Sequence, residues 1–81
     1  MGYFGRLKKL AKESFDSFMR YIDEHKNLYS YNKKTDEGDT EIEVVDVDEN
    51  FNEELIGRFY FNEDEDFLGN DEEYLKHIES K

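Results

Sequence analysis

Acidic side chains are the groups in this sequence most able to do chemistry, because 22 of its 81 residues are Asp or Glu. In two stretches the acidic residues have the spacing of calcium-binding loops. Asp46 and Asp48 open the first, but Phe51 stands where such a loop needs glycine. The second places oxygen ligands at five loop positions and again has an aromatic residue, Phe67, at the turn. Its ligands would be Asn62, Asp64, Asp66, Asn70 and Glu73. We therefore predict a solvated acidic loop and no metal site.

Acid–base or nucleophilic catalysis has little support in the residues present. Paired carboxylates act as acid and base only when a desolvated pocket separates their pKa values, and a chain of this length has a thin core. Cysteine is absent, and the two histidines are His25 and His77. His25 falls on an apolar helix stripe, where a packed histidine is expected, and His77 has no partner motif. We predict no enzyme, no catalytic residue and no cofactor.

The elements that position the acidic groups begin with a helix. Apolar residues recur three or four positions apart, which predicts one amphipathic helix from about Phe4 to Lys26. Basic residues beside this stripe are typical of a helix on a membrane surface, but acidic residues share its polar face. We therefore expect the stripe to cover a sheet. Its members are Phe4, Leu7, Ala11, Phe15, Phe18, Ile22 and His25.

Alternating polar and apolar residues predict two strands, Thr40–Asp48 and Leu55–Asn62, and Leu28–Lys34 could form a third. The alternation slips at Val44 and Val45. A β-bulge there would restore one apolar and one acidic face, because an extra residue shifts the two-residue period by one.

The acidic stretch 62–69 predicts a loop that leads to a short C-terminal helix. Asn70 as N-cap and Glu73 three residues later form a capping box. The buried edge of this helix would be Tyr74, Leu75 and Ile78. The predicted fold is α+β, a single domain over residues 1–81, with a long N-terminal helix packed on a two- or three-stranded antiparallel sheet and a short C-terminal helix.

Charge is divided unequally along the chain. Residues 1–34 carry a net charge of +4, residues 35–81 carry −15, and the whole chain carries −11. The net charge of the whole chain exceeds the magnitude of about 2–8 that keeps a small domain soluble. The excess favours a basic protein partner, and it argues against direct binding to nucleic acid or to an anionic membrane.

Strand geometry makes the acidic surface a candidate binding site. Carboxylates on one face of a strand stand about 6.6 Å apart, close to the step between successive phosphates of a nucleic acid. Tyr60, Tyr31 and Phe67 could supply apolar anchors. The predicted partner-binding residues are Glu41, Glu43, Asp46, Asp48, Glu49, Glu53, Glu54, Tyr60, Glu63, Asp64, Glu65 and Asp66.

In its small size, its acidic Asp-, Glu-, Asn-, Lys- and Tyr-rich composition and its helix–strands–helix order, the chain resembles the small acidic proteins that phages make against their hosts. These include anti-CRISPR proteins, anti-restriction DNA mimics, and inhibitors of host polymerases or nucleoid proteins. The resemblance implies a non-enzymatic inhibitor in the host cytoplasm that blocks the basic DNA- or RNA-binding surface of a host protein.

Two alternatives remain open. A small regulatory or immunity-type domain would bind its partner, or a second copy of itself as a homodimer, through apolar and aromatic residues. A calcium-responsive module would gain thermal stability in millimolar calcium. The partner's identity and the acidic residues that make contact do not follow from the sequence.

Overall fold

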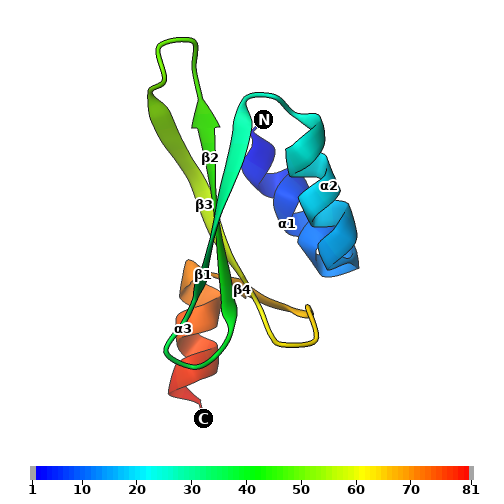
Figure 1. The fold of residues 1–81 in the computed structure, drawn as a ribbon. Helices are drawn as coiled ribbons and strands as arrows, with labels where there is room; N and C mark the ends of the chain where they lie inside the picture. The colour runs from blue at the N-terminus through cyan, green and yellow to red at the C-terminus, as the bar shows by residue number, and fades with distance from the viewer. Residues whose placement is uncertain (1, 81) are drawn as a thin grey trace.

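The structure of the protein is a computed structural model that describes residues 2–80, and within this range it has an α+β fold of three helices and one four-stranded antiparallel sheet (Figure 1). The strands follow one another across the sheet in chain order. The elements are α1 (Tyr3–Glu13), α2 (Phe15–Glu24), β1 (Leu28–Lys34), β2 (Thr40–Val47), β3 (Glu53–Phe61), β4 (Phe67–Asn70) and α3 (Asp71–Glu79).

The N-terminal region forms two helices, so the prediction of one helix over Phe4–Lys26 is wrong. The break is at Ser14, whose backbone is extended with φ −169° and ψ 150°. The Ser14 hydroxyl oxygen accepts a hydrogen bond from the amide of Ser17 at 3.0 Å, which caps α2. Serine favours such a cap over a helix interior because its short side chain competes for backbone groups. The break lets α1 pack on β3 while α2 packs on β1.

The sheet has four strands, so the prediction of two or three is also wrong. Residues 28–34, where a strand was possible, form β1. The fourth strand, β4, occupies the end of the stretch predicted as an acidic loop. Its Phe67 packs against Phe59 and Phe61 of the core, with ring centroids 6.4 and 5.5 Å apart. This packing stabilises a strand of four residues, too short to show an alternating pattern.

A β-bulge lies between Val44 and Val45, as the sequence predicts. Val44 pairs with Gly57 and Val45 pairs with Leu55, so the extra residue is Ile56 of β3. The pairing of β2 with β1 continues without interruption through the same positions. The bulge therefore bends β3 and leaves the alternation of β2 unchanged.

The expected division into one apolar and one acidic face is consequently wrong. Glu41 and Glu43 share a face of β2 with Val45 and Val47, whereas Asp46 lies on the opposite face. Each face of β2 is thus acidic along one part of the strand and apolar along the other.

The core lies between the sheet and the two N-terminal helices, which cover the same sheet face (Figure 1). Phe18 of α2 contacts Phe59 and Phe61 with ring centroids 5.1 and 5.2 Å apart. Aromatic packing of this kind adds to the burial of apolar area. The core residues are Leu7, Ala11, Phe18, Ile22, Leu28, Ile42, Val44, Phe59 and Phe61.

The C-terminal helix α3 packs on β3 and β4. The capping box predicted for Asn70 and Glu73 is present, and the Asn70 amide donates to the Glu73 carboxylate at 3.2 Å. Tyr74 is buried and Ile78 is half-buried, but Leu75 is 57 % exposed, so its predicted burial is wrong. We call the sheet face opposite α1 and α2, where α3 does not cover it, the open face. Within residues 2–80 no helix is both long and apolar enough to cross a bilayer.

Candidate partner-binding surface

Aromatic and aliphatic side chains cross the open face on three adjacent strands. Tyr29 of β1 pairs with Val45 of β2, which in turn pairs with Leu55 of β3. Paired residues project on the same side of a sheet, so these three side chains are neighbours. Tyr29 and Leu55 are 51 % and 47 % exposed, and Val45 between them is only 4 % exposed. Tyr31, two residues further along β1, is 46 % exposed.

Carboxylates follow on the next positions of the same face. Glu43 pairs across the strands with Tyr31 and Arg58. The Arg58 guanidinium donates to Glu43 at 3.0 Å and to Asp71 of α3 at 3.5 Å. One arginine thus compensates part of the charge of two carboxylates. This end of the open face is therefore less negative than the count of its acidic residues suggests.

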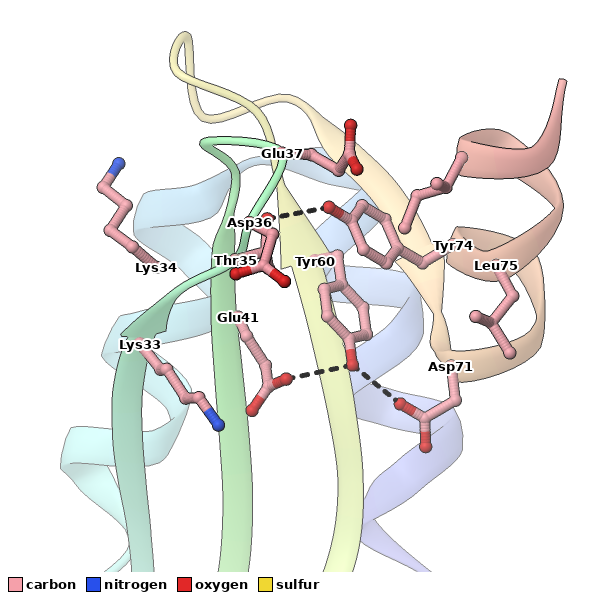
Figure 2. Close-up of a pocket in the computed structure, with 11 residues that line it drawn as sticks. Lys33, Lys34, Thr35, Asp36, Glu37, Glu41, Tyr60, Asp71, Tyr74 and Leu75 are labelled. Atoms are coloured by element: carbon pink, nitrogen blue, oxygen red, sulfur yellow. Dashed lines mark hydrogen bonds between the residues drawn. The ribbon is translucent and has the colours of Figure 1, made fainter. Parts of the chain in front are cut away.

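Tyr60 is buried beside these carboxylates. Its hydroxyl lies 3.1 Å from the Glu41 carboxylate and 3.0 Å from that of Asp71 (Figure 2). Its ring stacks on Tyr74, with centroids 4.1 Å apart and planes 1° from parallel. Burial, and then the nearby carboxylates of Asp71 and Glu41, raise the pKa of Tyr60 well above its ordinary value of 10.0. Tyr60 therefore joins α3 to the sheet and is not a surface anchor.

A cleft of about 610 Å³ lies between α3 and the turn that joins β1 to β2. The lining residues include no Ser, Cys or His, and the Thr35 hydroxyl is already hydrogen-bonded to Tyr74 at 2.9 Å. The cleft therefore contains no Ser–His or Cys–His pair. Its walls are Lys33, Lys34, Thr35, Asp36, Glu37, Glu41, Tyr60, Asp71, Tyr74, Leu75 and Ile78 (Figure 2).

Asp39 is the one buried charged residue among residues 2–80, with 7 % of its surface exposed. The Tyr74 hydroxyl donates to its carboxylate at 2.8 Å. The Asp39 amide donates to the Thr35 hydroxyl at 3.1 Å, and this hydroxyl in turn contacts Tyr74. The three residues close a hydrogen-bonded ring that fixes the β1–β2 turn against α3. Burial raises the pKa of Tyr74, which remains protonated and able to donate.

The β2–β3 hairpin is acidic and projects beyond the helices (Figure 1). The Asp48 carboxylate accepts hydrogen bonds from the amides of Asn50 and Asn52 at 2.8 and 2.9 Å. These bonds, that from the Asn52 amide contributing most, hold the pKa of Asp48 below its ordinary value. Phe51 at the tip is 86 % exposed and has a φ of 64°, a conformation that favours glycine. Glu49 and its neighbours are therefore carried by an ordered turn.

A second acidic turn joins β3 to β4. The Asn62 side chain accepts hydrogen bonds from the amides of Asp64 and Asp66, both at 2.9 Å. This turn and the β2–β3 hairpin lie at opposite ends of β3. The nine residues of β3 separate them by about 30 Å at ~3.3 Å per residue. The two acidic turns therefore do not form one continuous cluster.

The twelve predicted partner-binding residues fall into four groups. Glu41, Glu43, Glu53 and Tyr60 lie on the side of the sheet opposite α1 and α2, with Tyr60 buried under α3, and Asp48 and Glu49 belong to the hairpin at the end of β2. Asp46 projects on the helix side, where its carboxylate accepts a hydrogen bond from Asn27 at 3.0 Å, and it lines a cleft there with Glu54. Glu63, Asp64, Glu65 and Asp66 occupy the distant turn.

Three exposed apolar residues were missing from the predicted site. Leu55 was expected on the same side of its strand as Phe59, but the extra Ile56 turns it to the open face. Phe51 gave no signal, because a single aromatic residue in a polar segment has no periodicity. Tyr29 alternates with Tyr31 in the possible strand at residues 28–34, and this alternation is a signal that could have placed both on one face. The adjacent apolar residues Leu55 and Ile56 are the one feature that could have indicated an extra residue at this point of β3.

The two sequence stretches spaced like calcium loops make other contacts. Asp48 and Asn62 bind backbone amides of their own turns. Glu73 accepts a charged hydrogen bond from Lys8 at 3.0 Å, which lowers the pKa of its carboxyl group. Among residues 2–80 no three His, Asp or Glu side chains are arranged to hold a metal ion.

Comparison of the chain with protein-family models, curated proteins and solved structures found no match.

Proposed function

We propose that this protein is a non-enzymatic inhibitor that mimics nucleic acid and blocks the basic DNA- or RNA-binding surface of a host protein. CRISPR effectors, restriction enzymes, polymerases and nucleoid proteins have such surfaces. The observation that carries the proposal is the group of ordered carboxylates at the hairpin end of the open face. This group is Asp48, Glu49 and Glu53, and we call it the acidic end. The proposal places the protein in the host cytoplasm.

The separation of charge supports this function. The exposed Lys and Arg residues of α1 lie on the far side of the sheet from the open face. Lys8 of α1 is paired with Glu73. The attraction of a basic surface is therefore weakest at α1, and this difference orients its approach.

The order of the acidic end supports it further. Asp48 is held by two backbone amides and Glu53 accepts a hydrogen bond from the Tyr31 hydroxyl at 2.9 Å. Preorganised groups lose less entropy on binding than flexible ones. Nucleic acid releases its condensed counterions when it binds a basic protein, and high salt weakens that binding. Carboxylates in the same basic groove carry no condensed counterions, so high salt should weaken their binding by screening, and less steeply than it weakens the binding of nucleic acid.

The test compares two charge reversals of equal size at the two acidic turns. Glu49→Lys/Glu53→Lys changes the acidic end, and Glu63→Lys/Asp64→Lys changes the distant turn by the same net charge. Each protein is immobilised and incubated with bacterial lysate at 50 and 500 mM salt, with and without duplex DNA. We expect capture of a nucleic-acid-binding protein, and we expect DNA to displace it. High salt should weaken the capture. The reversal at the acidic end should abolish it, and the reversal at the distant turn should leave it intact.

Capture that is indifferent to salt and to DNA would refute mimicry. Equal loss in both reversed proteins would show that total charge alone controls capture, and it would refute the assignment to the acidic end.

A second function, a regulatory or immunity-type interaction domain, is favoured by the exposed Tyr29, Tyr31 and Leu55. In that case serine substitutions at these residues would weaken capture more than the charge reversals, and DNA would not compete.

A further inference from the structure

The exposed apolar side chains of the open face form one patch. Among the described residues, the large hydrophobic side chains with high exposure are Tyr29, Tyr31, Phe51, Leu55 and Leu75. Three of these, Tyr29, Tyr31 and Leu55, lie on the open face around the buried Val45. We call these three residues the aromatic strip. Contiguous exposed apolar residues with a polar rim are typical of interaction surfaces, whereas isolated ones are not.

The aromatic strip is held in place from both sides. The Tyr31 hydroxyl donates to Glu53 at 2.9 Å, which links a side chain of β1 to one of β3 across β2. This bond raises the pKa of Tyr31. The opposite face of the same strands carries Ile42 and Val44 of the core, so the sheet cannot turn to bury the strip. A rigid aromatic surface loses little entropy when a partner covers it.

The surroundings of the strip specify the charge of its partner. Glu43 and Glu53 lie on the same face as the strip, and Asp48 and Glu49 follow in the hairpin. A second copy of this chain would bring the same acidic rim against itself, and like charges at an interface cost free energy. A segment that places apolar side chains between Lys and Arg residues would be complementary both to the strip and to its rim.

The width of the strip sets the shape of that segment. Tyr29 and Leu55 are on strands separated by one intervening strand, which places them about 10 Å apart at ~4.8 Å per strand. One α-helix with its side chains is about 10–12 Å wide. We propose that the aromatic strip binds a basic amphipathic helix of the partner, with the apolar face of that helix against the strip. This inference rests on the proposed function and adds an apolar anchor to it.

The experiment uses designed peptides as probes. The first is an 18-residue helical peptide of leucine and lysine with all leucines on one face. In a second peptide serine replaces every leucine, and in a third glutamate replaces every lysine. Dissociation constants are measured by fluorescence anisotropy for the wild-type protein, Leu55→Ser, Tyr29→Ser and Leu75→Ser. Leu75 on α3 is the matched control, since it is a similarly exposed leucine outside the strip.

We expect the leucine–lysine peptide to bind most tightly. Leu55→Ser and Tyr29→Ser should each weaken it about fivefold, because about half of each side chain remains to be buried. Leu75→Ser should change it less than twofold, and none of the three variants should change binding of the serine–lysine peptide. Circular dichroism and thermal melting of each variant show whether the fold is retained.

Equal effects of Leu55→Ser and Leu75→Ser, or tight binding of the leucine–glutamate peptide, would overturn the inference. So would a monomer–dimer equilibrium in sedimentation that Leu55→Ser abolishes, since a second copy would then occupy the strip. Failure of DNA competition in the capture experiment refutes mimicry without changing the peptide results, so the two failures are distinguishable.

Discussion

Replacing Tyr74 by phenylalanine removes one hydroxyl group and leaves Asp39 buried without its hydrogen-bond donor. The bond that is lost spans 2.8 Å, and Asp39 is 7 % exposed. Hydrogen bonds to charged groups contribute about 1.5–3 kcal/mol, and an unpaired buried partner brings the cost toward the upper part of that range. We therefore expect Tyr74→Phe to lower the free energy of unfolding by about 2 kcal/mol, which lowers Tm by about 8–16 °C in a domain of this size.

Urea denaturation followed by circular dichroism measures this change. Tyr29→Phe is the matched control, because the Tyr29 ring is half-exposed and its hydroxyl makes no hydrogen bond within residues 2–80. It should cost less than about 0.5 kcal/mol, as surface substitutions usually do. In an Asp39→Ala background, Tyr74→Phe should cost clearly less, because the Asp39 bond is already absent and only the contact with Thr35 is lost. A Tyr74→Phe cost that is equally large in this background would refute the assignment to the Asp39 bond.

Three further predictions concern other parts of the fold. Because burial and two carboxylates raise the pKa of Tyr60 above 10.0, stability should fall as the pH rises above about 10, where only the unfolded phenol ionises. Tyr60→Phe should make this fall shallower in urea titrations at pH 8 and 11, and an unchanged slope would contradict the assignment. Ser14→Ala removes the cap of α2 and should cost about 1 kcal/mol by thermal melting; no loss would mean that Ser14 does not set the break. Gly57→Ala would place a Cβ atom 2.8 Å from the Phe4 ring and should cost about 1–3 kcal/mol. Phe4→Leu in the same chain should recover part of that loss, and a stabilising Gly57→Ala would show that the ring moves freely.

The predictions from sequence that held are those set by local chemistry. The capping box of α3 and the slip at Val44 and Val45 each depend on a few adjacent residues, and both are present. The α+β class follows from periodicity over longer stretches and is also confirmed. The break at Ser14 was missed because an apolar stripe continues through it. A cap then competes with helix continuation, and tertiary packing decides between them.

The candidate surface was harder to predict because it depends on which strand carries the bulge residue. An extra residue in β2 would have gathered Asp46 and Asp48 with Glu43 on one face. The extra residue is Ile56 of β3, and it brings Leu55 to the open face instead. A slip in the hydrophobic pattern locates a bulge without assigning the extra residue to either strand. The sequence therefore predicts an acidic surface, and only the register reveals its apolar centre.

The sequential order of the four strands has a kinetic consequence. Each strand pairs with the one before or after it in the chain, so every hairpin closes a short loop. Closing short loops costs little chain entropy, and domains rich in such local pairings cross their folding barrier within about milliseconds. We expect stopped-flow refolding to be fast and single-exponential, with no proline phase, since the chain contains no proline. A newly synthesised molecule would thus reach its native state almost as soon as it leaves the ribosome.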